Sequence, residues 1–426
     1  QLGYHISVPL VNRFELEKLM SRPGGLAGQG TLLGLLDMFS GGAFNKFSIF
    51  AMGIMPYISA SIILQLLTVV IPFLEELQKK GEEGRKKINQ YTRYLTVVIT
   101  FLQSFMLTYW IVNQGAAMGV RLVENPVLFR PLAAFSMTTG TLVVMWLGER
   151  VTERGIGNGI SLIIFANIVA RLPDAVGILI TRLMLGEGEV GGSIFRDVTW
   201  TTTFIIAVLM VAVVASIVVL TQAQRRIPIK RGRQVVGRRT YGGQMSYLPI
   251  RINIAGVIPV IFASSLLQFP ATIAQFANSE FLDSMSRMLS PGHWLYEIFY
   301  ILGIIFFCYF YTAIVFNPKD VAENLQKYGS TVPGFSHGRK TEEYIDQITT
   351  RVTLFGAIFL AVIAVMPELV MNYMKIPYAI SGFLGGTSMI IVVGVALDTI
   401  KAIENHLLLR NYDGFRKKGR MKARSG

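Results

Sequence analysis

Charged residues are scarce in this sequence. Aspartate, glutamate, lysine and arginine make up 15% of the 426 residues, whereas 52% are apolar and the mean hydropathy is +0.49. Soluble domains carry about 25% charged residues. A chain of this length with so few charges cannot cover a water-facing surface, which excludes a soluble enzyme and a disordered chain. The composition instead indicates a polytopic membrane protein.

Cysteine and the usual signatures of active sites are also missing. Cys308 is the one cysteine, so no intramolecular disulfide can form. The absence of any Gly-Lys pair excludes a P-loop, and no His-Glu-x-x-His motif is present. Because the four histidines are scattered, we expect neither a metal site nor a cofactor. The run Gly155–Gly159 resembles a phosphate loop, but it lies between apolar segments and predicts a tight turn before a helix.

Charges are absent from the middle of every apolar run except the fourth, and Glu297, Glu368 and Asp398 lie near the ends of runs. Proton-coupled carriers and intramembrane aspartyl proteases need buried carboxylates, so both classes are disfavoured. A secondary transporter with a carbonyl-lined sodium site stays open as an alternative. Any work that the protein performs must draw its energy from a partner or a gradient.

Long apolar runs are what the sequence has instead. About 20 apolar residues in a helix cross the ~30 Å hydrocarbon core of a bilayer. The runs are continuous and do not alternate, so they predict helices and not membrane strands. The fourth run is the weakest, because Arg171, Pro173 and Asp174 interrupt it. The nine predicted spans are 53–72, 94–113, 131–148, 160–182, 200–221, 252–274, 297–316, 352–371 and 378–398.

Basic residues predict the orientation of these spans. Of the 40 lysines and arginines, 29 lie in loops on the side that holds the C-terminus and 10 lie opposite. The more basic side of a membrane protein faces the cytoplasm, so we expect a cytoplasmic C-terminus. Nine spans that end inside must begin outside. We therefore expect a tenth, N-terminal span to be largely missing from this chain.

Segment 31–50 differs from the nine runs. It is apolar but contains Asp37, Gly41, Gly42 and Lys46. Two charges are costly in lipid, so a re-entrant helix buried in protein fits the segment. An interfacial helix on the outer surface fits the residues equally well.

One motif occurs twice, as Gly53–Gln65 and Gly256–Gln268. Seven of the thirteen positions are identical at an offset of 203 residues, in the pattern GxxPxIxASxxLQ. Five spans lie from the first copy to just before the second, and because five is an odd number the second copy is inverted in the membrane. Inverted repeats place a functional site at their interface near the midplane. Convergent packing of two proline-bearing helices is the simpler alternative.

The repeat carries a matched proline and isoleucine. We expect Pro56 and Pro259 to bend their helices. Ile58 and Ile261 follow at equivalent places, and two such side chains around a shared axis would form an apolar constriction that closes a pore by excluding water. Packing within a bundle or against lipid explains any single isoleucine equally well.

The two large cytoplasmic loops differ in charge. Loop 223–251 has eight basic residues and no acidic one, with partial alternation that predicts a projecting basic hairpin. Its partner should be negatively charged, such as RNA, lipid headgroups or an acidic protein face. Loop 317–351 has five basic and five acidic residues and predicts a folded protein-docking element.

Four long segments carry a recognisable pattern, namely FSGGAFNKFSIFAMGIMPYISASIILQLLTVV at 39–70, WLGERVTERGIGNGISLIIFANIVA at 146–170, FFCYFYTAIVFNPKDVAENLQKYG at 306–329 and PYAISGFLGGTSMIIVVGVALDT at 377–399. These segments resemble the SecY family, the central subunits of the bacterial protein-translocation channel. The resemblance covers nearly all of 1–410 and is to bacterial members. It implies an all-α polytopic membrane protein with ten spans in two inverted five-helix halves, the first span largely missing here, and a re-entrant plug helix.

The resemblance also implies a pore ring and a plug. The ring residues carried over from the matching motifs are Ile54, Ile58, Ile164, Ile261, Leu266 and Ile391. Leu266 replaces the more usual isoleucine and is equally aliphatic. The plug corresponds to residues 35–48, with Asp37, Phe39, Gly41, Gly42 and Lys46 as its candidate residues. This match favours the re-entrant interpretation of the segment.

The spans that carry the repeat correspond to the two sides of the family's lateral gate, through which signal sequences and membrane segments pass into lipid. The candidate gate residues are Ser59, Gln65, Gln268 and Phe269. Polar contacts across such a seam would contribute about 0.6 kcal/mol each, weak enough to open. The two glutamines also suit a structural role near the prolines.

In the family, the two cytoplasmic loops dock the ribosome and the SecA motor. Arg238 and Arg239 match the paired arginines of the first loop. In the second loop Ser336 stands where the family has arginine, so Arg339 or Lys340 would have to substitute. The implied partners are SecE, SecG, the SecA ATPase, the ribosome through its rRNA, signal sequences, nascent polypeptides and membrane lipids.

The function implied is a non-enzymatic channel in the bacterial cytoplasmic membrane that translocates unfolded polypeptides and releases membrane segments laterally. The expected divisions are an N-terminal half at 1–185, a sixth span region at 186–222, the basic loop 223–251, a C-terminal half at 252–400 with loop 317–351, and a basic tail at 401–426.

Overall fold

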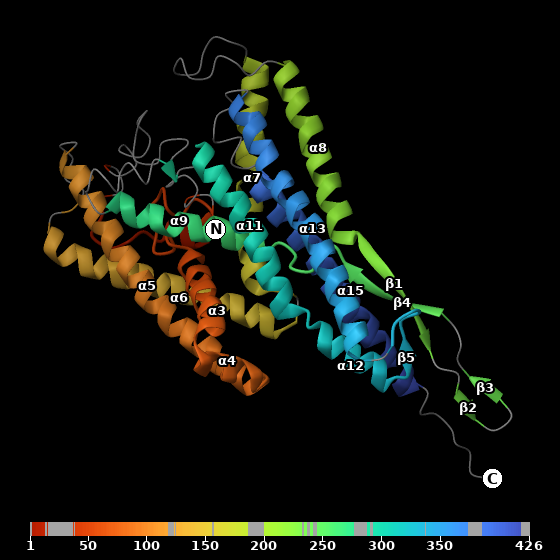
Figure 1. Cartoon of the computed structure of the whole chain (residues 1–426). Helices are drawn as coiled ribbons and strands as arrows, with labels where there is room; N and C mark the ends of the chain where they lie inside the picture. The colour runs from red at the N-terminus through yellow and green to blue at the C-terminus, as the bar shows by residue number, and fades with distance from the viewer. Residues whose placement is uncertain are drawn as a thin grey trace.

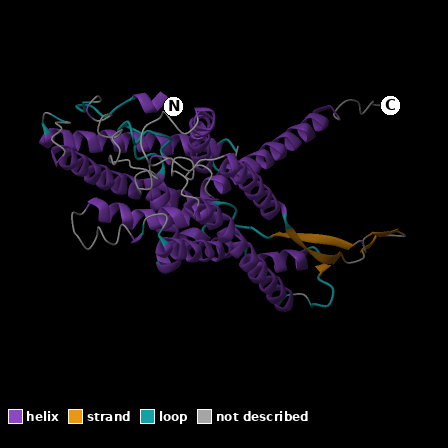
Figure 2. Cartoon of the chain, turned by 90° about the horizontal axis from the view of Figure 1, so that it is seen from above, coloured by secondary structure: helices purple, strands orange, loops and turns teal. Residues whose placement is uncertain are grey.

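The computed structural model shows a body of long helices with a small sheet at one end (Figure 1). Seen from above, the strands extend away from the helical body (Figure 2). The structure describes residues 2–12, 15, 37, 39–117, 123, 125–155, 157–185, 200–231, 234–236, 239–241, 245–276, 288–289, 293–336, 338–373 and 386–418.

Each predicted span corresponds to a helix. In chain order these are α3 (Met55–Val70), α5 (Glu82–Ala117), α6 (Pro126–Glu153), α7 (Gly159–Leu185), α8 (Trp200–Gln222), α9 (Ile258–Phe276), α11 (Trp294–Val315), α13 (Arg339–Tyr373) and α15 (Gly386–Lys418). Short helices η1 (Leu2–His5), α4 (Pro72–Lys79) and α12 (Pro318–Lys327) complete the described helical elements.

The helices differ in how well they suit a full membrane crossing. Within the described residues, six are long and apolar enough, and a seventh candidate is the pair α3 and α4, which is bent by 99°. The apolar parts of α7 and α9, Gly159–Pro173 and Ile258–Gln268, are shorter. The chain is a multi-pass membrane protein, and its shortest apolar helices are among those that surround the site described below.

The two halves repeat one order of packing. In the first half α3 packs on α5, α5 on α6 and α6 on α7, and in the second half α9 packs on α11, α11 on α13 and α13 on α15. The halves meet where α3 contacts α9 and where α7 contacts α15. This arrangement accords with the inverted repeat predicted from the sequence and places its two copies against each other.

The repeated GxxP motif starts helices and does not bend them. Pro56 and Pro259 each occupy the second residue of their helix, where a proline removes no backbone hydrogen bond. Gly53 and Gly256 precede them with φ of +56° and +66°, a region that favours glycine. The predicted bend at both prolines is therefore wrong, because the glycine makes the turn and the proline lies in the first turn of the helix that follows.

The turn predicted before the fourth span is confirmed. Gly155 and Gly157 have φ of +78° and +93°. The Asn158 side chain accepts a hydrogen bond from the backbone N–H of Ile160 (3.1 Å) at the start of α7. The glycine-rich run is thus a turn and helix cap and not a nucleotide loop.

The predicted basic hairpin is also confirmed. Strands β1 (Gln224–Arg231) and β4 (Met245–Arg251) pair antiparallel, and β2 (Gln234–Val236) pairs with β3 (Arg239–Tyr241) further along the same projection. Strand β5 (Ser330–Thr331) of loop 317–351 joins the other edge of β1. The two loops share a small buried core consisting of Ile227, Ile250, Val332 and Ile345. Figure 1 shows that the strands, α12 and the C-terminus lie at the same end of the molecule.

We predict that Gly140→Ala destabilises the protein. A Cβ at Gly140 of α6 would lie 2.3 Å from the carbonyl oxygen of Ile49, a backbone atom that cannot move aside cheaply. Overpacking of this kind costs about 1–3 kcal/mol. The measurement is thermal or denaturant unfolding of the purified protein in detergent.

Gly177→Ala in α7 is the matched control. No heavy atom lies within 4 Å of a Cβ built at Gly177, so alanine there should be neutral or stabilise by up to about 1 kcal/mol. Equal effects of the two substitutions would contradict the explanation by close contact.

Candidate pore, plug and lateral seam

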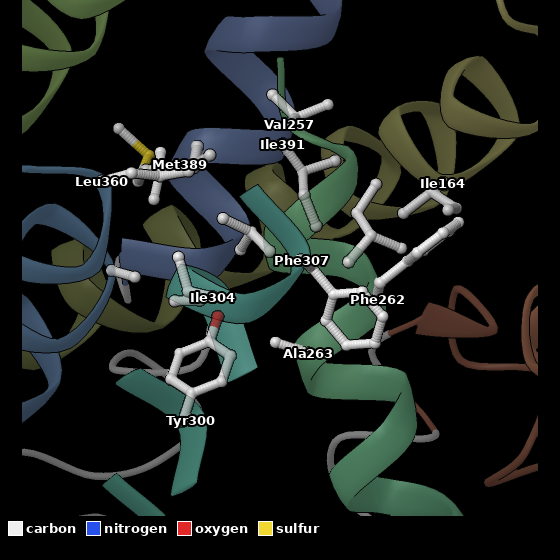
Figure 3. Packing of buried hydrophobic residues seen from close by; sticks show 14 of the residues in the cluster. Ile164, Val257, Phe262, Ala263, Tyr300, Ile304, Phe307, Leu360, Met389 and Ile391 are labelled. Carbon is white, nitrogen blue, oxygen red and sulfur yellow. The ribbon is translucent and has the colours of Figure 1, made fainter. Parts of the chain in front are cut away.

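Five of the six predicted ring residues meet in one buried cluster. Ile54 precedes α3, Ile58 lies within it, and Ile164, Ile261 and Ile391 come from α7, α9 and α15. None of the five is more than 4% exposed. Figure 3 shows Ile164 and Ile391 among the packed side chains of this cluster. Helices of both halves thus contribute to one buried apolar cluster.

Leu266 does not join this cluster. It is 42% exposed, whereas Ile261 of the same helix is 4% exposed. Successive helical residues are rotated by about 100°, so a separation of five positions turns Leu266 by about 140° from the face of Ile261. We therefore leave Leu266 out of the proposed ring.

Most other members of this cluster were not predicted from the sequence, and two of them, Val257 and Ile168, are related to predicted ring residues. Val257 is 4% exposed and precedes α9 just as Ile54 precedes α3. The internal repeat aligns these two positions, so it contained the signal. Ile168, 1% exposed, lies one helical turn beyond Ile164 on the same face of α7.

The plug segment is helical only at its start. Asp37 and Phe39 have helical conformation, and residues 40–47 form consecutive turns. Gly41, Gly42 and Phe47 have φ of +67°, +88° and +46°, which an α-helix cannot accommodate. The helix predicted over 35–48 is therefore wrong from residue 40 onward, and residues 35, 36 and 38 lie outside the described residues.

The front of the plug is tied to α7 by polar contacts. Arg171 Nη1 lies 2.6 Å from Asp37 Oδ2, with side chains 26% and 5% exposed respectively. The side-chain amide of Asn167 donates to the carbonyl oxygen of Phe39 (2.9 Å). The ion pair explains why a charged residue, Asp37, is present in the plug and why another, Arg171, is present in the weakest predicted span. Phe39 itself, 2% exposed, packs into the cluster that holds the ring.

The back of the plug is held by apolar packing. Phe44 and Phe47, 1% and 0% exposed, belong to a second cluster with residues of α5 and α6, including Leu107, Phe129 and Met137. The N-terminal segment adds backbone hydrogen bonds, from Val8 N–H to Phe47 O (3.1 Å) and from Ile49 N–H to Ile6 O (3.0 Å). Lys46 is exposed.

A cavity of about 80 Å³ opens in the seam between α3 and α9. It adjoins the ring at Ile58, Ile164 and Ile261. Its polar lining includes Tyr57, Ser61, Gln65, Asn158, Ser161 and Tyr311. This space lies on the side of the ring from which α7 and α9 begin, the side of the basic loops. A partly polar cavity next to an apolar constriction is suited to the end of a partly polar peptide segment.

The predicted gate residues occupy different levels of the seam. Gln65 lines the cavity and donates to Ser61 Oγ (3.2 Å), and Ser59 is half-buried. Gln268 is 6% exposed and lies ten residues beyond Ile258 along α9. Because Ile258 lines the cavity, Gln268 is about 15 Å further along the helix. The two glutamines therefore do not face each other. Phe269 belongs to α9, but its side chain lies outside the described residues.

The predicted docking residues lie in both loops. Arg239 is the first residue of β3, but its side chain lies outside the part of the chain that the structure describes. Arg238 lies outside the described residues altogether. Arg339 is exposed and forms an ion pair with Glu343 on the same helix (3.0 Å), and Lys340 is exposed. The stacked rings of Phe335 and Tyr344, 4.1 Å between centroids, support the loop beside them.

Comparisons with known proteins agree with this geometry. The SecY family model matches residues 48–400. The SecY protein translocase subunit of Thermotoga maritima is 43% identical over 100% of this chain and 93% of its own length, and that of Escherichia coli K12 is 44% identical over 99% and 92%.

Solved channels share the fold at lower identity. A structure described as a protein conducting channel has a TM-score of 0.60 at 18% identity, covering 95% of this chain and 88% of that one. A SecY study of the plug domain in the closed state scores 0.54 at 18% identity, covering 88% and 90%. Sec61 in the canine ribosome-channel complex scores 0.55 at 16% identity, covering 95% and 88%. By sequence and fold together, the chain belongs to the SecY family of protein translocase subunits.

Proposed function

We propose that the isoleucine cluster is the closed constriction of a pore through this protein. Because the chain belongs to the SecY family, that pore is a protein-conducting channel. The observation that carries the proposal is the meeting of Ile54, Ile58, Ile164, Ile261 and Ile391, from helices of both halves, in one buried cluster. A ring of aliphatic side chains excludes water and so blocks ions while the pore is at rest. The chain is a channel subunit and not an enzyme.

The plug is the second element of the seal. Phe39 of the plug packs in the buried cluster that holds the proposed ring. A plug in this place blocks the outer side of the pore. The plug study of the related SecY describes stabilisation of the closed state and maintenance of a membrane seal in that protein, which supports the same role here.

The seam between α3 and α9 is the proposed lateral gate. Signal sequences would enter the seam at the cavity beside the ring and leave into lipid, and unfolded secretory chains would continue through the constriction. Ser61 and Gln65 are among the polar groups at this level, and the hydrogen bond between them lies within α3, so it does not hold the two sides of the seam together. Polar contacts between helices in a membrane contribute about 0.6 kcal/mol each, so a seam of this kind can separate.

The cytoplasmic loops are the proposed docking surface for the source of energy. The acid-free hairpin 223–251, with Arg238 and Arg239, suits the phosphates of ribosomal RNA. The solved canine complex that shares the fold is a ribosome-channel complex. Arg339 and Lys340 on the neighbouring loop would contribute to SecA docking, and SecE and SecG would be the companion subunits. The same bias of basic residues supports a cytoplasmic C-terminus in a bacterial inner membrane.

Removal of the plug tests this function. We predict that the purified wild-type complex is silent in planar bilayers and that deletion of residues 36–47 gives flickering conductance, because the ring then remains as the one seal. The measurement is single-channel current at fixed voltage. A deletion variant as silent as wild type would contradict the plug and the pore path.

A secondary transporter, the alternative from the sequence, is not favoured by the family. The same experiment distinguishes it. If both forms stayed silent while the wild type exchanged a small solute across liposomes, alternating access would replace the channel.

A further inference from the structure

The plug is held at its two ends by interactions of different kinds. At the front, Asp37 pairs with Arg171, and Asn167 donates to the backbone of Phe39. The Asp37 carboxylate also accepts from the backbone and side-chain N–H groups of Asn45, at 3.0 and 2.7 Å, but these two bonds lie within the plug. The front is thus tied to α7 by an ion pair and a hydrogen bond, and Phe39 adds its buried ring.

At the back, the attachment is mainly apolar. Phe44 and Phe47 are almost fully buried between α5 and α6. Ser48 donates to the carbonyl oxygen of Gly3 (2.9 Å), and Ser7 and Ser48 form an antiparallel bridge. Releasing this end would expose two phenylalanine side chains to water, whereas water can replace the polar contacts of the front and so offset part of their loss.

We propose that Arg171 and Asn167 of α7 form a latch that holds plug residues Asp37 and 39–42 over the pore, while residues 44–50 stay anchored when the latch opens. The hydrogen bonds between Asn45 and Asp37 break in the same step. Gly41 and Gly42, both with positive φ, lie at the end of the moving part, next to the anchored part, and can absorb the change in backbone direction. The proposal deepens the proposed function, on which it rests. Arg171 and Asn167 are positioning residues, because they act through the plug.

Charge provides the first test. Asp37→Asn and Arg171→Gln should each raise the open probability in planar bilayers at least about tenfold, the effect of losing one charge-assisted hydrogen bond on a two-state equilibrium. Arg171→Lys keeps the charge and should stay near wild type. The double variant should leak no more than either single one, because both changes remove the same interaction.

Arg93→Gln is the matched control. It breaks an ion pair of the same kind, Arg93 with Glu149 (2.8 Å), between α5 and α6, and should leave the channel silent. If Arg171→Gln is silent while the 36–47 deletion conducts, the latch is wrong and the plug stands. If the deletion is silent too, the proposed function itself fails.

Cross-links test the anchored part, in a Cys308→Ala background. The Cα atoms of antiparallel partners lie about 4.5–5.5 Å apart, within the range of a disulfide, so Ser7→Cys and Ser48→Cys can be joined. This disulfide should leave translocation within about twofold of the reduced form. Joining Phe39→Cys to Asn167→Cys with a short bifunctional reagent should lower translocation at least about tenfold. Equal inhibition by the two cross-links would overturn the division into a moving front and a fixed back.

Discussion

Sustained ion current is the expected result when asparagine replaces Ile58 and Ile391 in a channel that lacks residues 36–47. In that background the ring is the remaining seal, and both side chains are at most 3% exposed in the ring cluster. Two amide groups would let water enter a constriction that stays dry only because its lining is apolar. We expect the mean current to rise at least about tenfold above the flickering of the deletion alone.

Two further variants make this result specific. Leu266→Asn introduces the same amide into α9 at a position that is 42% exposed and outside the cluster, so the flicker should not change. Ile391→Val keeps an aliphatic lining and should also preserve the seal. If Leu266→Asn conducts as strongly as the ring variants, the closed pore does not run where the buried isoleucines meet.

Loss of translocation is the second large effect, expected when α3 and α9 are joined covalently. Gln65→Cys and Ile258→Cys line the same seam cavity from the two helices, and a short bifunctional reagent can join them. The cavity of about 80 Å³ holds a handful of water molecules, whereas a helix with its side chains is about 10 Å across. A signal sequence therefore cannot pass unless the helices separate.

The measurement compares cross-linked and untreated protein in proteoliposomes that contain the motor. Both translocation of a secretory precursor and release of a membrane segment should fall to background after cross-linking. Each single-cysteine variant, treated in the same way, should keep its activity. Membrane segments that still reached the lipid through a joined seam would show that they leave by another route.

Much of the fold could be predicted because membrane insertion depends on properties that are local in sequence. Hydropathy located the nine long helices among the described residues, and the bias of basic residues grouped loops 223–251 and 317–351, which the structure joins through β1 and β5. The offset of 203 residues between GIMPYISASIILQ and GVIPVIFASSLLQ identified the two helices that meet in the seam. The resemblance to SecY needed only long continuous motifs.

The errors share a different cause. Pro56 and Pro259 were expected to bend helices because sequence does not reveal whether a proline lies inside a helix or at its start. Leu266 was placed in the ring because an aliphatic side chain fits the motif, but the rotation of α9 decides which side chains face the constriction. The plug was expected to be a helix although Gly41 and Gly42 adopt backbone conformations that end one.

The sequence by itself thus determined the membrane class, the spans, the inverted repeat and the family, since each depends on composition or on residues close together in the chain. The tertiary structure alone decided which of the predicted ring residues are buried in one cluster, and that Asp37 and Arg171, 134 positions apart, form an ion pair. The physical reason is that helix rotation and contacts between distant segments follow from the simultaneous packing of all the helices. No local pattern of residues contains that information.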